Sequence, residues 1–270
     1  MSQNNSNIFS YLFRMDLRRN NQVFRPLNID GRLAIAKKAN LTHYLIEVPN
    51  IIGEGNDLPT NHTTSDTEII MINVDGDGNC FYRSISQLIL GTEEAHMEFR
   101  ALMKEYLEKL KLNFYNAGWQ VDYDSRLPVA GKPNIWAENE DIYAMATALG
   151  VTIVNCHYDT KGDIKYFPFH PLTDLRGPSN PEEHYKYAPA IYIANTGTST
   201  IVPLVDTNHF RAIIGVRKKM EHRTTTTVTA PGPSTYNYIP GLNTQWPKMQ
   251  SSRKVSPKKN TKELEASIST

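Results

Sequence analysis

Apolar residues follow a helical period most clearly between residues 99 and 110. Six apolar side chains fall there at i, i+3, i+4, i+7, i+8 and i+11: Phe99, Leu102, Met103, Tyr106, Leu107 and Leu110. Charged residues stand between them, so one face of the segment is apolar and the other is polar. This pattern predicts an amphipathic helix that packs on a core.

Two shorter segments also predict helices. One begins near Cys80 and ends at Gly91, and the other runs from Asn139, as its N-cap, to Gly150. A glycine directly after the last apolar position is typical of a helix C-terminus, because glycine adopts left-handed backbone angles without strain.

Apolar runs of strand length begin before these helices and continue after them. The two clearest are EIIMINV at 68–74 and VTIVNC at 151–156, and three further candidates lie at 164–169, 190–194 and 209–216. Because most helices come early in the chain and most strands come late, the order of elements favours an α+β fold.

Composition divides the chain into three parts. Residues 1–66 indicate an N-terminal extension and linker, since their apolar runs are brief and Gly53–Asp66 is rich in Gly, Asn, Thr and Pro. Residues 67–218 are expected to form one compact domain. Residues 219–270 are dense in Thr, Ser, Pro and Lys without an apolar period, which predicts a disordered tail.

The overall composition excludes several classes of protein. An apolar content of 40% excludes wholesale disorder, and a formal net charge of +1 argues against a dedicated nucleic-acid binder. No apolar run approaches the ~18 residues of a membrane span. We therefore expect a soluble, cytoplasmic protein, while the basic stretch Arg253–Lys259 leaves a nuclear signal or a nucleic-acid contact open.

The chain has only two cysteines, Cys80 and Cys156, without CxxC spacing. This number is too small for a disulfide framework, and the spacing does not suit a structural zinc site. Cys156 lies in an apolar strand and is expected to be an inert buried thiol. No metal or organic cofactor is expected.

Cys80 has different surroundings, because it follows the Gly-rich turn Asp75-Gly76-Asp77-Gly78-Asn79 and opens a helix. The N–H groups and positive dipole end of a helix favour a thiolate. A glycine-containing turn also lets backbone N–H groups stabilise an oxyanion. The alternative is a small buried residue beside a turn.

A nucleophilic cysteine needs a base, and His209 is the best candidate. It follows the loop Asp206-Thr207-Asn208 and begins a strand-like run, a setting that holds an imidazole rigidly. The other histidines lack this setting. The sequence around Cys80 also lacks the CGSCW signature of papain-like enzymes.

Three short blocks stand in order along the chain: DGDGNCFYRS at 75–84, WAENEDIYAMA from Trp136, and Asn208-His209-Phe210. Together they resemble the ovarian tumour (OTU) family of deubiquitinating cysteine proteases. The first block is very specific, and the other two gain weight from their order. The resemblance spans about residues 68–216 and implies an OTU-type cysteine protease fold, with a small central β-sheet flanked by helices.

The resemblance implies that Cys80 is the nucleophile and that His209 is the general base and acid. Asp77 matches an aspartate of the family's catalytic loop, which implies that it belongs to the active site and helps to shape the oxyanion hole. The alternative is that Asp77 only caps a turn, because Asp-Gly pairs favour turns. Asn79 is expected to supply loop hydrogen bonds and Arg83 a structural ion pair. Trp136 and Glu140 are expected to pack and to begin a helix.

One position departs from the family pattern. Many members carry Asp or Asn two residues after the histidine to orient its ring, but Arg211 stands there and cannot accept an imidazole N–H. The ring must then be oriented by Asp206, Asn208, a more distant group or a backbone carbonyl. On an extended strand Asn208 would point to the opposite side, and a bare Cys–His dyad is also possible in principle.

The resemblance implies a thiol-dependent hydrolase that removes ubiquitin, or a ubiquitin-like modifier, from lysine side chains. Ubiquitin or ubiquitin-conjugated proteins are then the expected partners. A catalytically inactive ubiquitin-binding scaffold on the same fold is the alternative, since a fold alone does not guarantee activity. A processing protease from a viral or transposon polyprotein is a third possibility.

Overall fold

The computed structural model describes residues 23–47, 49–158, 161–172, 188–196 and 209–219. Its described strands form one sheet, in the spatial order β1-β5-β4-β2-β3. The strands are β1 (Thr67–Ile72), β2 (Thr152–Tyr158), β3 (Ile164–Phe169), β4 (Ala190–Asn195) and β5 (Phe210–Lys218). β2 and β4 pair in parallel, and the other neighbours pair antiparallel.

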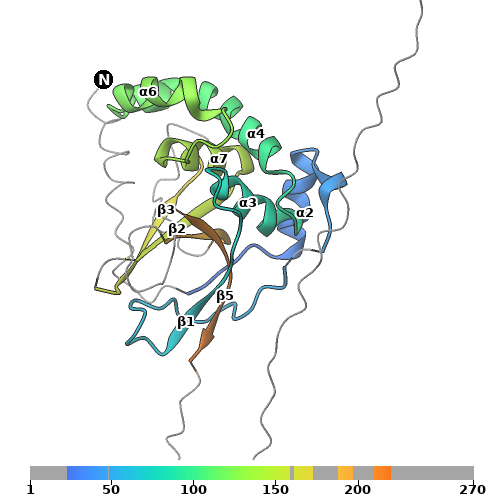
Figure 1. Cartoon of the computed structure of the whole chain (residues 1–270), viewed down its shortest axis with the longest axis vertical. Coiled ribbons are helices and arrows are strands. Elements are labelled where there is room, and N and C mark those ends of the chain that lie inside the picture. Colours follow the sequence, from blue (N-terminus) through green and yellow to red (C-terminus); the bar gives the residue numbers. More distant parts are fainter. Residues whose placement is uncertain (1–22, 48, 159–160, 173–187, 197–208, 220–270) are drawn as a thin grey trace, which may run out of the picture. The chain divides into compact units, whose positions relative to one another are not determined.

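Helices cover one face of this sheet (Figure 1). The described helices are α2 (Ile29–Lys38), the 3₁₀ turn η2 (Thr42–Tyr44), α3 (Cys80–Leu90), α4 (His96–Lys109), α5 (Lys111–Asn116), α6 (Gln120–Ala130) and α7 (Asn139–Leu149). The predicted ends of α3 and α7 are confirmed, because Gly91 and Gly150 both adopt left-handed backbone angles. The expected N-cap of α7 was Asn139, whereas the helix is capped by Glu138, whose backbone N–H donates to the Asp141 side chain. Because these helices pack on a largely antiparallel sheet, the predicted α+β class is confirmed.

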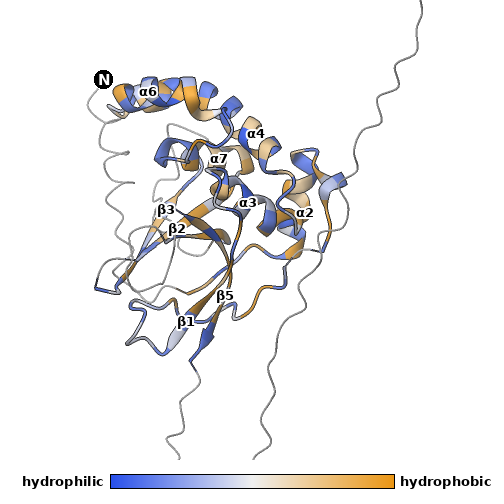
Figure 2. Ribbon diagram, in the orientation of Figure 1, coloured by the Kyte–Doolittle hydropathy of each residue, from blue (hydrophilic) through white to orange (hydrophobic). Residues whose placement is uncertain are grey.

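The sheet separates two apolar clusters, because alternate residues of each strand point to opposite faces. On β5, Ala212 belongs to the cluster under the helices and Ile213 to the cluster on the other face. α4 contributes Phe99, Met103 and Leu107 to the helical side, as its apolar period predicted. Toward its C-terminal end β5 changes from apolar to polar, where it leaves the core (Figure 2).

The N-terminal boundary predicted at residue 67 is wrong. Residues from 23–47 and 49–66 pack into the domain: Phe24 and Ala36 are fully buried, and Leu58 lies in the core of the second face. Ile52 pairs with β5, since its N–H donates to the Ile214 carbonyl and its own carbonyl accepts from Val216, each at 3.0 Å. The short apolar runs of this N-terminal part showed no clear period, but they are buried by contacts with residues that are distant in the sequence.

Gly53 shows why the supposed linker is part of the fold. Its φ is +76°, and a Cβ there would lie only 1.7 Å from the backbone oxygen of Val216. Only glycine fits so close to a neighbouring strand. The predicted tail lies outside the described residues apart from Lys219. Among the described helices, none has both the length and the apolar character that a membrane span requires.

Candidate active site

Cys80 is the first residue of α3 and follows residues 75–79, which we call the Cys80 loop. Gly78 in this loop has a φ of +81°, and a Cβ on it would lie 2.4 Å from the backbone oxygen of Asn134. The loop therefore requires glycine at this position, as the turn chemistry indicated. Cys80 itself is only 1% exposed.

The Cys80 thiol experiences two opposing effects. Burial is the larger and raises the pKa of the Cys80 thiol to about 11, while backbone N–H groups of Phe210, Phe81 and Cys80 act in the opposite direction. The Phe210 nitrogen donates to Sγ at 3.4 Å. The helix N-terminus thus presents N–H groups to the sulfur as predicted, but the expected thiolate is not favoured. Desolvation keeps the thiol protonated at neutral pH.

His209 immediately precedes the residue whose N–H contacts the sulfur. It is 5% exposed, and its carbonyl oxygen accepts hydrogen bonds from the backbone N–H and the hydroxyl of Thr196, both at 3.0 Å. The end of β4 therefore fixes the backbone of His209. The structure brings Cys80 and His209, which are distant in sequence, to one end of the sheet.

Asn73 orients the His209 ring. Its side-chain oxygen lies 3.1 Å from His209 Nε2, although the two residues are 136 positions apart. An amide oxygen can only accept, so this contact places a proton on Nε2 and leaves Nδ1 to exchange a proton with the thiol in the neutral ring. No motif in the sequence indicated Asn73. The available signal was an uncharged polar side chain within the apolar run at 68–74.

Two of the other groups considered for this role cannot be placed against the ring. Asp206 and Asn208 lie outside the described residues. Arg211 lies in β5 opposite Ala194 of β4, and burial lowers the pKa of its guanidinium. Among the described residues, a more distant group of the kind that the sequence left open, the Asn73 amide, contacts the His209 ring.

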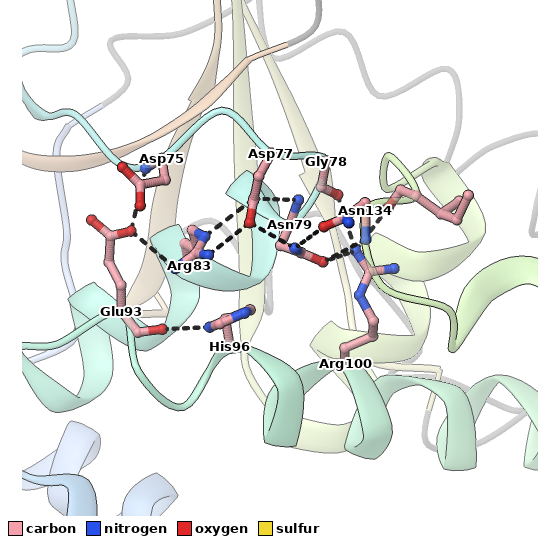
Figure 3. A network of polar contacts seen from close by, with 10 residues as sticks. Asp75, Asp77, Gly78, Asn79, Arg83, Glu93, His96, Arg100 and Asn134 are labelled. Atoms are coloured by element: carbon pink, nitrogen blue, oxygen red, sulfur yellow. Dashed lines mark hydrogen bonds and ion pairs between the residues drawn. The ribbon is translucent and has the colours of Figure 1, made fainter. Parts of the chain in front are cut away.

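Asp77 lies within the Cys80 loop, and its side chain points toward Asn79 and toward Arg83 of α3 (Figure 3). Its carboxylate accepts from Arg83 Nη2 at 2.7 Å, and from the backbone and side-chain nitrogens of Asn79, each at 2.9 Å. These bonds, with that from Arg83 the strongest, hold the pKa of Asp77 well below its usual range. This geometry favours a role in holding the loop. The expected ion pair of Arg83 is confirmed, and it extends to Glu93 at 3.4 Å.

Asn79 makes the loop hydrogen bonds that the sequence predicted. Its amide nitrogen donates to Asn134 Oδ1 at 2.9 Å as well as to Asp77, and its oxygen accepts from the Asn134 N–H at 3.1 Å. It also accepts from Arg100 Nη2 at 2.8 Å. Asn79 therefore connects the Cys80 loop to residue 134 and to α4. Sequence analysis did not identify Asn134 or Arg100.

The block that begins at Trp136 is structural, as predicted. The Trp136 side chain packs against the core, and its carbonyl accepts from Arg126 Nη2 at 2.7 Å. Arg126 also forms a buried ion pair with Asp141 in the first turn of α7. Burial raises the pKa of Glu140 beside it. The pair fixes the start of α7.

The second cysteine has the surroundings expected of an inert thiol. Cys156 is 0% exposed in β2, and burial raises the pKa of its thiol well above the usual value. Within the described ranges, no three His, Cys, Asp or Glu side chains gather closely enough to hold a metal ion.

Residues 71–127 match the family model described as "Vertnin, OTU domain". This segment contains Asn73, Asp77, Cys80 and Arg100 and ends before His209. The match confirms the resemblance to the OTU family that the motifs indicated. No curated protein sequence matches this chain.

Solved structures of OTU domains are also similar. The OTU domain of OTUD1 is 20% identical, with 53% of this chain and 83% of that chain covered and a TM-score of 0.39. The OTU protease of Farallon virus is 26% identical, with coverages of 54% and 83% and a TM-score of 0.35. The Hazara virus OTU bound to ubiquitin is 20% identical, with coverages of 54% and 80% and a TM-score of 0.36.

Proposed function

We propose that this OTU-like chain is a cysteine isopeptidase that releases ubiquitin, or a ubiquitin-like modifier, from lysine side chains. One observation carries the proposal: the Cys80 sulfur lies at the N-terminus of α3 and accepts from the Phe210 amide, and the ring of His209, the residue before Phe210, contacts Asn73. Nucleophile, base and orienting group are the parts that acyl transfer requires.

The first step makes a thioester. His209 Nδ1 takes the proton from Cys80, and the sulfur attacks the carbonyl carbon of the modifier's C-terminal glycine. Because burial raises the pKa of the Cys80 thiol, the thiolate depends on His209 to accept the proton. The Asn73 oxygen accepts from Nε2 and so stabilises the imidazolium that forms.

Backbone N–H groups at the start of α3 and in the Cys80 loop stabilise the tetrahedral oxyanion. His209 then gives its proton to the departing lysine amine, and the carbon–nitrogen bond breaks. In the second half, His209 takes a proton from water as the water attacks the thioester, and returns it to the sulfur. The cycle uses one water and restores the thiol.

A binding protein without activity is the second candidate, and the burial of Cys80 favours it. A thiol that is 1% exposed and protonated at neutral pH can belong to a scaffold that retains the fold alone. Such a protein would bind the modifier without cleaving it.

Cleavage of a panel of di-ubiquitins by the purified chain tests the proposal. The wild-type chain and its Cys156→Ala variant should produce free ubiquitin, and Cys80→Ala should not. Binding of di-ubiquitin without cleavage by the wild-type chain would favour the scaffold. Cleavage retained in Cys80→Ala would exclude Cys80 as the nucleophile.

A further inference from the structure

Arg100 is a buried arginine that reaches the Cys80 loop from α4. The residue is 0% exposed, and its guanidinium lies 4.1 Å from the centre of the Tyr82 ring in α3. Arg100 follows Phe99 and is buried in α4, although the apolar period placed the charged residues of this helix on its polar face. Taking a cation out of water is costly, so its hydrogen bonds must compensate.

The guanidinium bonds to oxygens of three separate segments. Nη2 donates to the Gly78 carbonyl at 3.0 Å and to Asn79 Oδ1 at 2.8 Å in the Cys80 loop. The same nitrogen lies 2.8 Å from the Ile135 carbonyl, and Nη1 donates to the Ala130 carbonyl at 3.0 Å. Arg100 thus joins the loop to the segment between α6 and α7.

These contacts fix the peptide bond between Gly78 and Asn79 at both of its polar ends. Its carbonyl oxygen is held by Arg100, and its N–H donates to Asp77 Oδ1 at 2.9 Å. A peptide that follows a glycine rotates easily, because glycine has no Cβ to restrict it. Rotation of this peptide would exchange the positions of its oxygen and its N–H, one residue before the nucleophile.

We propose that Arg100 is a positioning residue, which fixes the Gly78–Asn79 peptide and thereby the Cys80 loop for the reaction at Cys80. Its effect on turnover rests on the proposed function, whereas its effect on the loop does not. A Met side chain would fill a similar volume without a desolvation cost. The guanidinium adds the ability to hold several acceptors in one plane, which a single ammonium group lacks.

The test compares Arg100→Lys with a matched variant, Arg32→Lys. Arg32 in α2 is also buried, at 6% exposed, and also bonds to backbone carbonyls, those of Leu27 and Pro49, both at 2.9 Å. Each variant keeps its charge and loses the planar donor. Three quantities are measured on the full chain: kcat and KM with a fluorogenic ubiquitin C-terminal amide, the iodoacetamide alkylation rate of Cys80, and folding by circular dichroism.

Arg100→Lys should lower kcat by about 100-fold with KM within about threefold, because a small displacement of groups that position the reaction has an effect of this size. Cys80 alkylation should rise at least about tenfold, because loosening the loop that leads into α3 should increase reagent access to a thiol that is 1% exposed. Arg32→Lys should change neither. Unchanged kcat and alkylation in Arg100→Lys, or equal changes in both variants, would overturn the inference.

Two further outcomes are decisive. If Arg100→Lys does not fold, Arg100→Gln is used in its place, with the same expected changes in kcat and alkylation rate. If neither Arg100 variant folds while Arg32→Lys does, Arg100 is needed for folding itself, and the inference is contradicted. If the wild-type chain cleaves no modifier, the proposed function fails, and the alkylation rates alone decide whether Arg100 holds the loop.

Discussion

Replacing Asn73 tests whether an amide orients the base. In Asn73→Ala the acceptor that lies 3.1 Å from His209 Nε2 is lost, while the backbone at the end of β1 is retained. The bond strengthens when the ring becomes an imidazolium. A hydrogen bond to a charged group contributes ~1.5–3 kcal/mol, and each 1.4 kcal/mol changes a rate about tenfold.

The structure sets where in that range the effect should fall. His209 is 5% exposed, but Asn73 lies in an exposed position, so water can replace part of the lost bond. We expect kcat to fall ~10- to 30-fold, below the effect of losing a buried aspartate. KM should change little, because the bond acts on the base and not on the modifier.

The assay is steady-state hydrolysis of a fluorogenic ubiquitin amide between pH 5 and 9. Asn73→Asp is the matched control, since it keeps an acceptor at the same place and adds a charge. It should retain kcat within about threefold, and its acidic limb should move to higher pH because a carboxylate favours the imidazolium. Activity of Asn73→Ala within twofold of wild type would refute the reasoning.

Other predictions concern the loop, the thiol and the core. Asp77→Asn and Arg83→Met should each lower kcat about tenfold, and the double variant should lose no more than either single one, because both break the same contact; additive losses in this cycle would show separate roles. Iodoacetamide alkylation of Cys80 in the free chain should rise about tenfold per pH unit between pH 8 and 10, because the thiol pKa is raised to about 11; a rate that is flat over this range would indicate a preformed ion pair with His209. Arg126→Met should destabilise the chain by ~3–5 kcal/mol in urea unfolding, because Asp141 is left as a buried unpaired charge; a change under 1 kcal/mol would contradict this.

The sequence predicted those parts of the fold that depend on local pattern. The period of α4, the glycines that end α3 and α7, and the approximate positions of the five strands all follow from neighbours in the chain. Cys80 and His209 were recognisable from their short motifs. The part of the chain before β1 packs on the rest of the domain, but its sequence has no periodic apolar pattern. The N-terminal boundary was therefore misplaced.

The rest of the site depends on contacts that only the folded chain creates. Asn73 and His209 are 136 positions apart, and nothing in either segment indicates the other. Arg100 occupies a helix whose apolar period suggested a charged surface position, but the segment around Ile135 closes over it. The thiol pKa likewise depends on how completely the fold excludes water from Cys80.

Labelling with a ubiquitin that carries a C-terminal electrophile tests the central claim most directly. One covalent adduct per wild-type chain is expected, mapped to Cys80 by peptide mass spectrometry, and none at Cys156. His209→Ala should slow its formation strongly, because the buried thiol depends on that base. A wild-type chain that binds the probe but forms no adduct, or forms it at Cys156, would contradict the account.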